Sequence, residues 1–311
     1  MRHGVILLLA VLAALPLFSA ERARDRVRAD LKKSGIRVGV SFKDKSYVFI
    51  GYHAAETNLS THVAMRESFY QRAVLRAKHD LLKARRTTVT AGDTVQMLDD
   101  GVQSVILTKS TCKYLSEAQL HGSSVIASAE SWDADKGVYE VAVAVAWSRK
   151  LEADGLRAAG RGLPSGDEVE DSPEWEKELS KLHLAGVIGS RQFVDSQGKR
   201  RFFGVGAADI EGRRGKQLRD AVRIAELRAA RNLGFALHSD AALQDTAVSV
   251  LKMMNSGGLS ETEAWEEFVM RVSQRCARTI MGHEVFSADT VVHPLTGHRL
   301  YISVYGVEPN E

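Results

Sequence analysis

Cysteine, proline and aromatic residues are all scarce in this chain of 311 residues, which holds two Cys, five Pro and 7% aromatic side chains. Two cysteines cannot form the disulfide framework on which small secreted domains depend. Five prolines exclude collagen-like and proline-rich disordered chains. The remaining composition, 44% hydrophobic and 26% charged, is that of a folded protein, and the length predicts about two domains at roughly 100–200 residues each.

The chain also has no large excess of one charge, since it holds 42 Lys and Arg and 39 Asp and Glu, and the two signs are interspersed along the sequence. Proteins that bind nucleic acids usually carry a basic patch or stripe, so we expect no nucleic-acid partner. The chain has no Walker loop, no His-Glu-x-x-His helix and no Gly-x-Ser-x-Gly elbow. We expect no cofactor and no catalytic centre, because the residues shared by the two copies of an internal repeat are mainly Gly, Ala, Leu, Phe and Arg, which serve packing.

One long hydrophobic run exists, at residues 5–17, and it follows Arg2 and precedes the small residues Ser19 and Ala20. This order is typical of a secretory signal peptide. The run is shorter than the roughly 20 residues of a membrane helix. The sequence therefore predicts a signal peptide at 1–20, no transmembrane span, and a periplasmic or secreted mature protein.

The main structural signal is an internal repeat. The segment 49–55, Phe-Ile-Gly-Tyr-His-Ala-Ala, returns at 202–208 as Phe-Phe-Gly-Val-Gly-Ala-Ala, and 74–81 returns at 226–233. Two further matching pairs of blocks keep the same order: 32–40 with 181–189, and 137–147 with 297–307. Repeats in one order indicate tandem units. We interpret 24–150 and 172–311 as two copies, joined by a flexible linker at 151–171 that is rich in glycine and charge.

Each copy is predicted to begin with two strands around a polar turn and to continue with helices. Apolar residues at helical spacing predict a helix face in each copy. The first face holds Tyr70, Val74, Ala77 and Leu81; the second holds Leu218, Ala221, Val222, Ala225, Ala229, Leu233 and Ala236. Second helices are expected at 93–115 and at 260–281, the latter opened by a capping box of Ser260 with Glu263.

Each copy is predicted to end in a hairpin, 125–132 with 138–147 and 285–292 with 300–307, where β-branched and aromatic residues alternate with other residues. Hairpins separated by helices indicate the α+β class. We therefore expect two tandem β-β-α-α-β-β units with antiparallel sheets covered by helices, related by a pseudo-twofold axis.

The pair Gly204 and Gly206 has the beginning of a dinucleotide-binding motif but lacks the third glycine. The matching segment of the first copy has Tyr52 and His53 in place of small residues. We reject a nucleotide site and expect a bulge or a tight strand exit at these glycines.

The pattern Phe-x-Gly-x-x-Ala-Ala followed by a helix with x-Leu-Arg-Ala-x-x-x-Leu resembles the repeat of outer-membrane lipoproteins of the Helicobacter Lpp type and of the N-terminal region of flagellar assembly protein T. The resemblance covers about the first half of each copy. It implies an envelope protein built for interaction and assembly. The whole chain is also similar to uncharacterised exported bacterial proteins.

Two small sets of residues are candidates for chemistry. His293 and His298 flank a predicted four-residue turn and are a candidate metal pair, although exposed turn histidines without a metal are the competing interpretation. Cys112 and Cys276 occur once in each copy, late in the second helix. They are interpreted either as buried small apolar residues or, in an oxidising compartment, as a disulfide between the copies.

A basic run in the second copy includes Arg213, Arg214, Arg219 and Arg223 and continues to Arg228 and Arg231. It is a candidate surface for an anionic partner, with a solvated face mixed with acidic residues as the alternative. The leading hypothesis is an exported, non-catalytic interaction or assembly module that binds an envelope protein or an anionic envelope polymer. The alternatives are a small-ligand module using the groove between the copies and a metal-dependent enzyme at the histidine hairpin.

Overall fold

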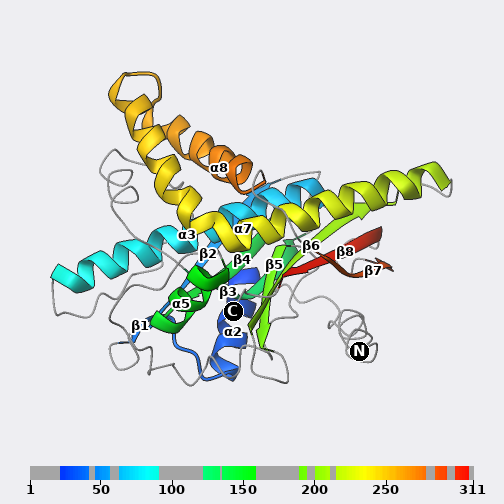
Figure 1. Cartoon of the computed structure of the whole chain (residues 1–311), viewed down its shortest axis with the longest axis horizontal. Coiled ribbons are helices and arrows are strands. Elements are labelled where there is room, and N and C mark those ends of the chain that lie inside the picture. The colour runs from blue at the N-terminus through cyan, green and yellow to red at the C-terminus, as the bar shows by residue number, and fades with distance from the viewer. Residues whose placement is uncertain are drawn as a thin grey trace.

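Two antiparallel sheets of four strands each organise the chain in the computed structural model (Figure 1). The structure describes residues 22–41, 46–56, 63–90, 122–133, 135–158, 189–194, 200–210, 215–277, 284–292 and 298–307. The first sheet has the order β1-β2-β4-β3 and contains β1 (Gly39–Ser41), β2 (Ser46–Glu56), β3 (Ser124–Asp133) and β4 (Val138–Trp147). The second has the order β5-β6-β8-β7 and contains β5 (Gly189–Val194), β6 (Arg200–Asp209), β7 (Glu284–Val292) and β8 (Arg299–Val307). The predicted α+β class and both predicted hairpins are confirmed.

Helices cover the sheets. The described helices are α2 (Ala23–Lys33), α3 (Val63–Thr90), α5 (Arg149–Ala158), α7 (Gly215–Asn255) and α8 (Glu261–Ala277). The first sheet lies between α3 on one face and α2 on the other, while α7 crosses one face of the second sheet (Figure 1). No helix in the described part of the chain is long and apolar enough to cross a membrane.

Strand β4 explains why both faces of the first sheet are covered. Its valines, among them Val141 and Val143, join the buried cluster of α3, and its alanines, among them Ala142 and Ala144, join the cluster of α2. Successive side chains of a strand point to opposite faces, so this Val-Ala alternation presents an apolar surface on each side. The smaller alanines lie on the face where α2 packs.

The predicted helix faces are largely confirmed. All four residues of the first face are buried, as are Ala221, Ala225, Ala229 and Leu233 of the second, whereas Leu218 is exposed. Helix α7 continues far beyond this face. Its C-terminal half and α8 join the core of the first sheet through residues such as Val250 and Phe268. The second half of the chain therefore completes the core of the first sheet, while the second sheet has separate buried clusters with residues such as Ile302 and Leu233.

Glycines allow the helices to lie unusually close to the sheets. A Cβ on Gly204 would overlap the Ala229 carbonyl oxygen, and a Cβ on Gly206 would overlap the carbonyl oxygen of Ala225, both in α7. The predicted bulge or strand exit at these two glycines is wrong, because β6 pairs with β8 in continuous register through both of them. Their function is to admit the backbone of α7.

The first sheet uses the same packing, with a Cβ on Gly51 overlapping the carbonyl oxygen of Ala73 in α3. Strand order agrees between the sheets. One register shift occurs in β3 after Val125 and another at the matching place in β7, after Val285. These likenesses accord with the duplication hypothesis, but the duplication and its pseudo-twofold axis stay predictions.

Other predictions have mixed outcomes. The capping box of α8 is confirmed, since Glu263 N donates to Ser260 Oγ at 3.3 Å and Ser260 N donates to Glu263 Oε2 at 3.0 Å. Helix α5 occupies residues 151–158 of the segment expected to be a flexible linker, so that part of the prediction is wrong. Helix α2 was not predicted. The signal peptide, the helix at 93–115 and linker residues 159–171 lie outside the described residues.

Candidate functional site

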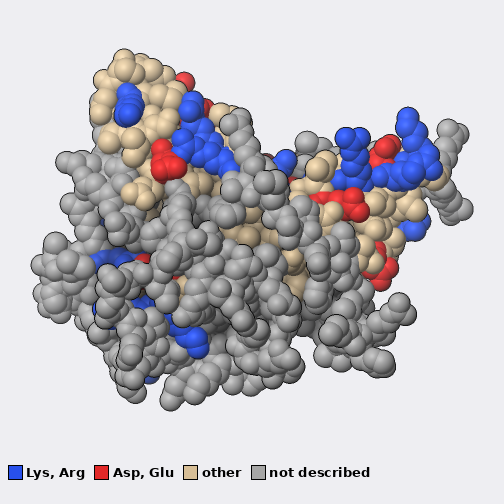
Figure 2. Space-filling view, viewed as in Figure 1, with Lys and Arg blue, Asp and Glu red and all other residues tan. Residues whose placement is uncertain are grey.

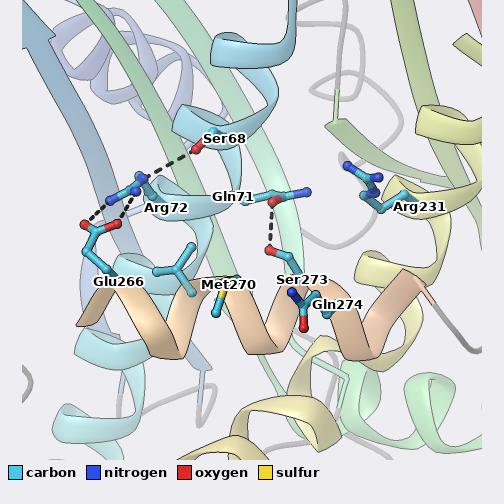
Figure 3. Close-up of a pocket in the computed structure, with 9 residues that line it drawn as sticks. Ser68, Gln71, Arg72, Arg231, Glu266, Met270, Ser273 and Gln274 are labelled. Carbon is cyan, nitrogen blue, oxygen red and sulfur yellow. Dashed lines mark hydrogen bonds and ion pairs between the residues drawn. The ribbon is translucent and has the colours of Figure 1, made fainter. Parts of the chain in front are cut away.

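A cavity of about 330 Å³ lies where α3 meets α7 and α8, between the two halves of the chain (Figure 3). Helix α3 contributes Ser68, Gln71 and Arg72, which share one face because they are three and four residues apart. Helix α8 contributes Glu266, Val269, Met270, Ser273 and Gln274, again at helical spacing, and α7 contributes Arg231. The cavity is lined by helices of both halves and not by the two sheets.

An ion pair closes one end of the cavity. The guanidinium of Arg72 binds both carboxylate oxygens of Glu266 and also donates from Nε to Ser68 Oγ at 3.4 Å (Figure 3). The hydrogen bond from Arg72 lowers the pKa of Glu266, so this carboxylate is ionised at neutral pH. A two-point contact between planar groups also fixes the orientation of α8 relative to α3.

Gln71 is the most buried polar side chain of the cavity, with 6% of its surface exposed. Its Oε1 accepts a hydrogen bond from Ser273 Oγ at 2.8 Å. Its Nε2 is buried and has no acceptor among the described residues. Figure 3 shows the nitrogen end of this amide turned away from Ser273, toward the side on which Arg231 lies. A buried donor without an acceptor costs about 1–3 kcal/mol, so Gln71 marks a place where an acceptor would be bound favourably.

Behind the cavity wall, Glu67 of α3 pairs with two arginines of α7. Its oxygens lie 3.3 Å from Arg228 Nε and 3.8 Å from Arg231. Burial raises the pKa of Glu67, and the two arginines oppose that rise. Arg228 also donates to the carbonyl oxygen of Ala207 at 2.7 Å, whereas Arg231 is half-exposed and makes no hydrogen bond within the described part of the chain.

His53 of β2 lies close to this group. Its ring packs edge-on against Phe69, with 4.5 Å between ring centroids. Burial, followed by the positive charge of Arg72, lowers the pKa of His53 to about 4. The imidazole is therefore neutral at physiological pH and adds no charge near the cavity.

The N-terminal half of α7 carries a second candidate surface. Ile224 and Leu227 have 42% and 61% of their surface exposed, one turn apart, and Arg219 and Arg223 are exposed beside them. We call these four residues the α7 outer face. Lys and Arg atoms gather over this projecting half of α7, with some Asp and Glu atoms among them (Figure 2).

The predicted basic run is divided by the structure into two parts. Arg219 and Arg223 are on the exposed helix, while Arg228 and Arg231 turn toward Glu67 of the first half. Arg213 and Arg214 lie outside the described residues. The interpretation of the whole run as a solvated face is therefore wrong for Arg228, which is paired and partly buried.

The other predicted site residues are only partly described. His293 and Cys112 lie outside the described residues, so the metal pair and the disulfide stay predictions. His298 is half-exposed, and its Nδ1 lies 3.4 Å from Asp209 Oδ1. Cys276 is fully buried on the apolar face of α8. Among the residues that the structure describes, no three His, Cys, Asp or Glu side chains form a group suited to a metal ion.

Comparison with known proteins yields little. No family model and no curated protein matches the chain. A solved structure of a hypothetical protein from Francisella tularensis is similar over 95% of this chain and 94% of its own, with 14% identity and a TM-score of 0.49.

Sequence reasoning included Arg231 in the basic run but missed Gln71, Arg72 and Glu266. Arg72 and Glu266 are 194 positions apart in sequence, and Gln71 and Ser273 are 202 apart. Neither pair belongs to a local motif. Glutamine and serine on helix faces carry no sequence signal that distinguishes a cavity wall from solvent-exposed surface.

Proposed function

We propose that this chain is an exported, non-catalytic binding module of the cell envelope, and that its α7 outer face docks an acidic partner protein. The observation that carries the proposal is the exposed pair Ile224 and Leu227 beside Arg219 and Arg223. An apolar contact flanked by arginines suits a partner with apolar side chains among carboxylates. The signal-like N-terminus and the resemblance to envelope assembly proteins support the location.

The positions of the ionisable groups also agree with a binding role. Charged pairs join separate elements: Arg66 with Glu130 at 3.6 Å, Glu67 with Arg228 at 3.3 Å, and Arg72 with Glu266. Two of these pairs connect the first half of the chain to the second. Groups used in this way hold helices in position and support a rigid surface for association.

The partner is expected to be a protein, because a purely anionic polymer would not use the exposed Leu227. The test is quantitative co-purification from envelope extracts of the native organism. Two double variants, Arg219→Glu with Arg223→Glu and Ile224→Ser with Leu227→Ser, should each lose at least nine-tenths of the bound partner. Lys252→Glu, an exposed change at the other end of α7, serves as the control and should keep it.

Three results would overturn the proposal. Retention of the partner by both double variants would remove the α7 outer face as the docking site. Loss only in the charge variant, together with recovery of polysaccharide or lipid instead of protein, would indicate an anionic polymer. Turnover of a substrate by the purified chain would contradict a non-catalytic role.

The alternative of a small-ligand module is favoured by one observation, the cavity at the junction of α3, α7 and α8. Its volume lies at the lower end of the range for ligand sites, so any ligand there is small. The two functions are compatible, since the α7 outer face and the cavity are different surfaces.

A further inference from the structure

We propose that the cavity between α3, α7 and α8 is a binding site for a small organic monocarboxylate, held between the Arg231 guanidinium and the Gln71 amide. This inference goes beyond the proposed docking of a protein on the α7 outer face and does not depend on it.

Both donors line the same cavity, and the nitrogen end of Gln71 is turned toward the side on which Arg231 lies (Figure 3). Gln71 is fixed on one side by the hydrogen bond from Ser273, which commits its oxygen and leaves its amino group for another acceptor. Arg231 lines the same cavity, and its Nη1 lies 3.8 Å from Glu67 Oε1, an ion pair that is longer than a hydrogen bond. A carboxylate has two oxygens that accept hydrogen bonds in one plane, so it can use the guanidinium and the amide together.

The charge balance favours a single negative charge. Among the residues that line the cavity, Arg72 and Arg231 are positive and Glu266 is negative. Glu266 pairs with Arg72. The lining therefore carries one more positive charge than negative charge. A monoanion completes this balance, whereas a phosphate dianion would bring an excess of negative charge beside the buried Glu67.

On the α8 wall of the cavity, Val269 and Met270 add apolar surface among the polar Glu266, Ser273 and Gln274, which favours an organic tail over a bare ion. Val269 is buried and Met270 has 45% of its surface exposed at the cavity. A flexible methionine adapts to different apolar groups. A carboxylate with a short hydrocarbon chain therefore uses both walls of the cavity.

The test is isothermal titration of the full mature chain with hexanoate at neutral pH. Hexanol, which has the same chain without the charge, and inorganic phosphate are the comparison ligands. Hexanoate should bind at least tenfold more tightly than either of them. Arg231→Gln should weaken hexanoate binding at least tenfold, because it removes the cation proposed to bind the carboxylate. Arg231 is half-exposed, so this variant is expected to fold.

Gln71→Glu is the second variant. Glutamate keeps an acceptor for Ser273 but replaces the donor with a carboxylate that itself pairs with Arg231, so hexanoate binding should fall at least tenfold. Lys216→Gln, an exposed change near the start of α7, is the matched control and should bind like the parent. Circular dichroism of every variant separates lost binding from lost folding.

Each contrary result has a definite meaning. No measurable hexanoate binding by the folded parent chain would overturn the site. Equal binding by the parent and Arg231→Gln would place the ligand elsewhere. Phosphate binding as tight as hexanoate binding would refute the monocarboxylate class, and tight hexanol binding would refute the role of charge.

Discussion

Replacing Gly204 with alanine tests the close packing of α7 on β6. The added Cβ would overlap the carbonyl oxygen of Ala229 and would lie 2.8 Å from the Cα of Leu233. Carbon atoms in contact are normally about 3.5–4.0 Å apart, so α7 would have to move away by about 1 Å. The atoms in the way belong to helix backbone, which cannot turn aside as a side chain can.

The expected cost follows from that displacement. Inserting a methyl group into a packed core usually costs about 1–3 kcal/mol, and a clash with backbone belongs at the upper end or beyond. We therefore expect Gly204→Ala to lower the free energy of unfolding by about 3 kcal/mol or more. At about 2–4 °C for each kcal/mol, the Tm should fall by about 6–12 °C.

The assay is thermal and urea unfolding followed by circular dichroism. Gly215→Ala is the matched control, because its Cβ would lie 3.8 Å from the nearest atom, Arg219 Nη1, in ordinary contact. That control should be neutral or slightly stabilising, since alanine favours helix over glycine. Gly51→Ala, which meets α3 in the same manner, should behave like Gly204→Ala. We expect Gly204→Ala to lose about 3 kcal/mol of unfolding free energy; a loss of less than about 1 kcal/mol would refute the packing argument.

Three further predictions concern stability. Burial and Arg72 lower the pKa of His53 to about 4, so its contribution is fully present above its unfolded pKa of about 6.5 and is lost as the pH falls toward 4. By about pH 4.5 the loss should be about 2 kcal/mol, and urea unfolding of His53→Gln should show a smaller acid effect. Tyr70→Phe removes a hydroxyl that accepts from Ser190 N at 3.0 Å and contacts Ser190 Oγ at 2.8 Å, so urea unfolding should show a loss of about 1–3 kcal/mol. Ser260→Ala removes the cap that Glu263 uses and should cost about 1 kcal/mol in the same assay, while Ser260→Thr should retain most of it.

Each of these three predictions has its own contrary outcome. An identical acid effect in parent and His53→Gln would mean that another group carries the pH dependence. Unchanged stability of Tyr70→Phe would show that the buried contact between α3 and β5 contributes nothing. Equal losses for alanine and threonine at residue 260 would point away from capping.

Much of the fold follows from local patterns in the sequence. The hairpin of β3 and β4 is visible as alternation, the face of α3 as helical spacing, and the start of α8 as a capping box, and each depends on neighbours within a few residues. The packing at Gly206 could not be predicted in this way. A glycine in a strand can mark a bulge, the end of the strand or the close approach of a helix. At Gly206 the contact that distinguishes these is with Ala225, which lies in another element.

The cavity was beyond sequence reasoning for a related physical reason. It exists because the C-terminal half of α7 turns α8 onto α3, so that Gln71 and Ser273 meet. That arrangement depends on shared burial between the two halves, which no single helix reveals. The exposure of Ile224 and Leu227 on α7 could not be predicted either. A helical pattern of apolar residues does not show which part of the helix lies over the sheet.

Site-specific photo-crosslinking tests the proposed binding function most directly. A photoreactive phenylalanine analogue is placed at Leu227 on the α7 outer face, or at Lys252 at the other end of α7 as the control, in the native host. We predict that illumination links the Leu227 site to one acidic envelope protein, that Arg219→Glu with Arg223→Glu abolishes this product, and that the Lys252 site gives none. Equal products from both sites, or no protein product from Leu227, would contradict a docking function for α7.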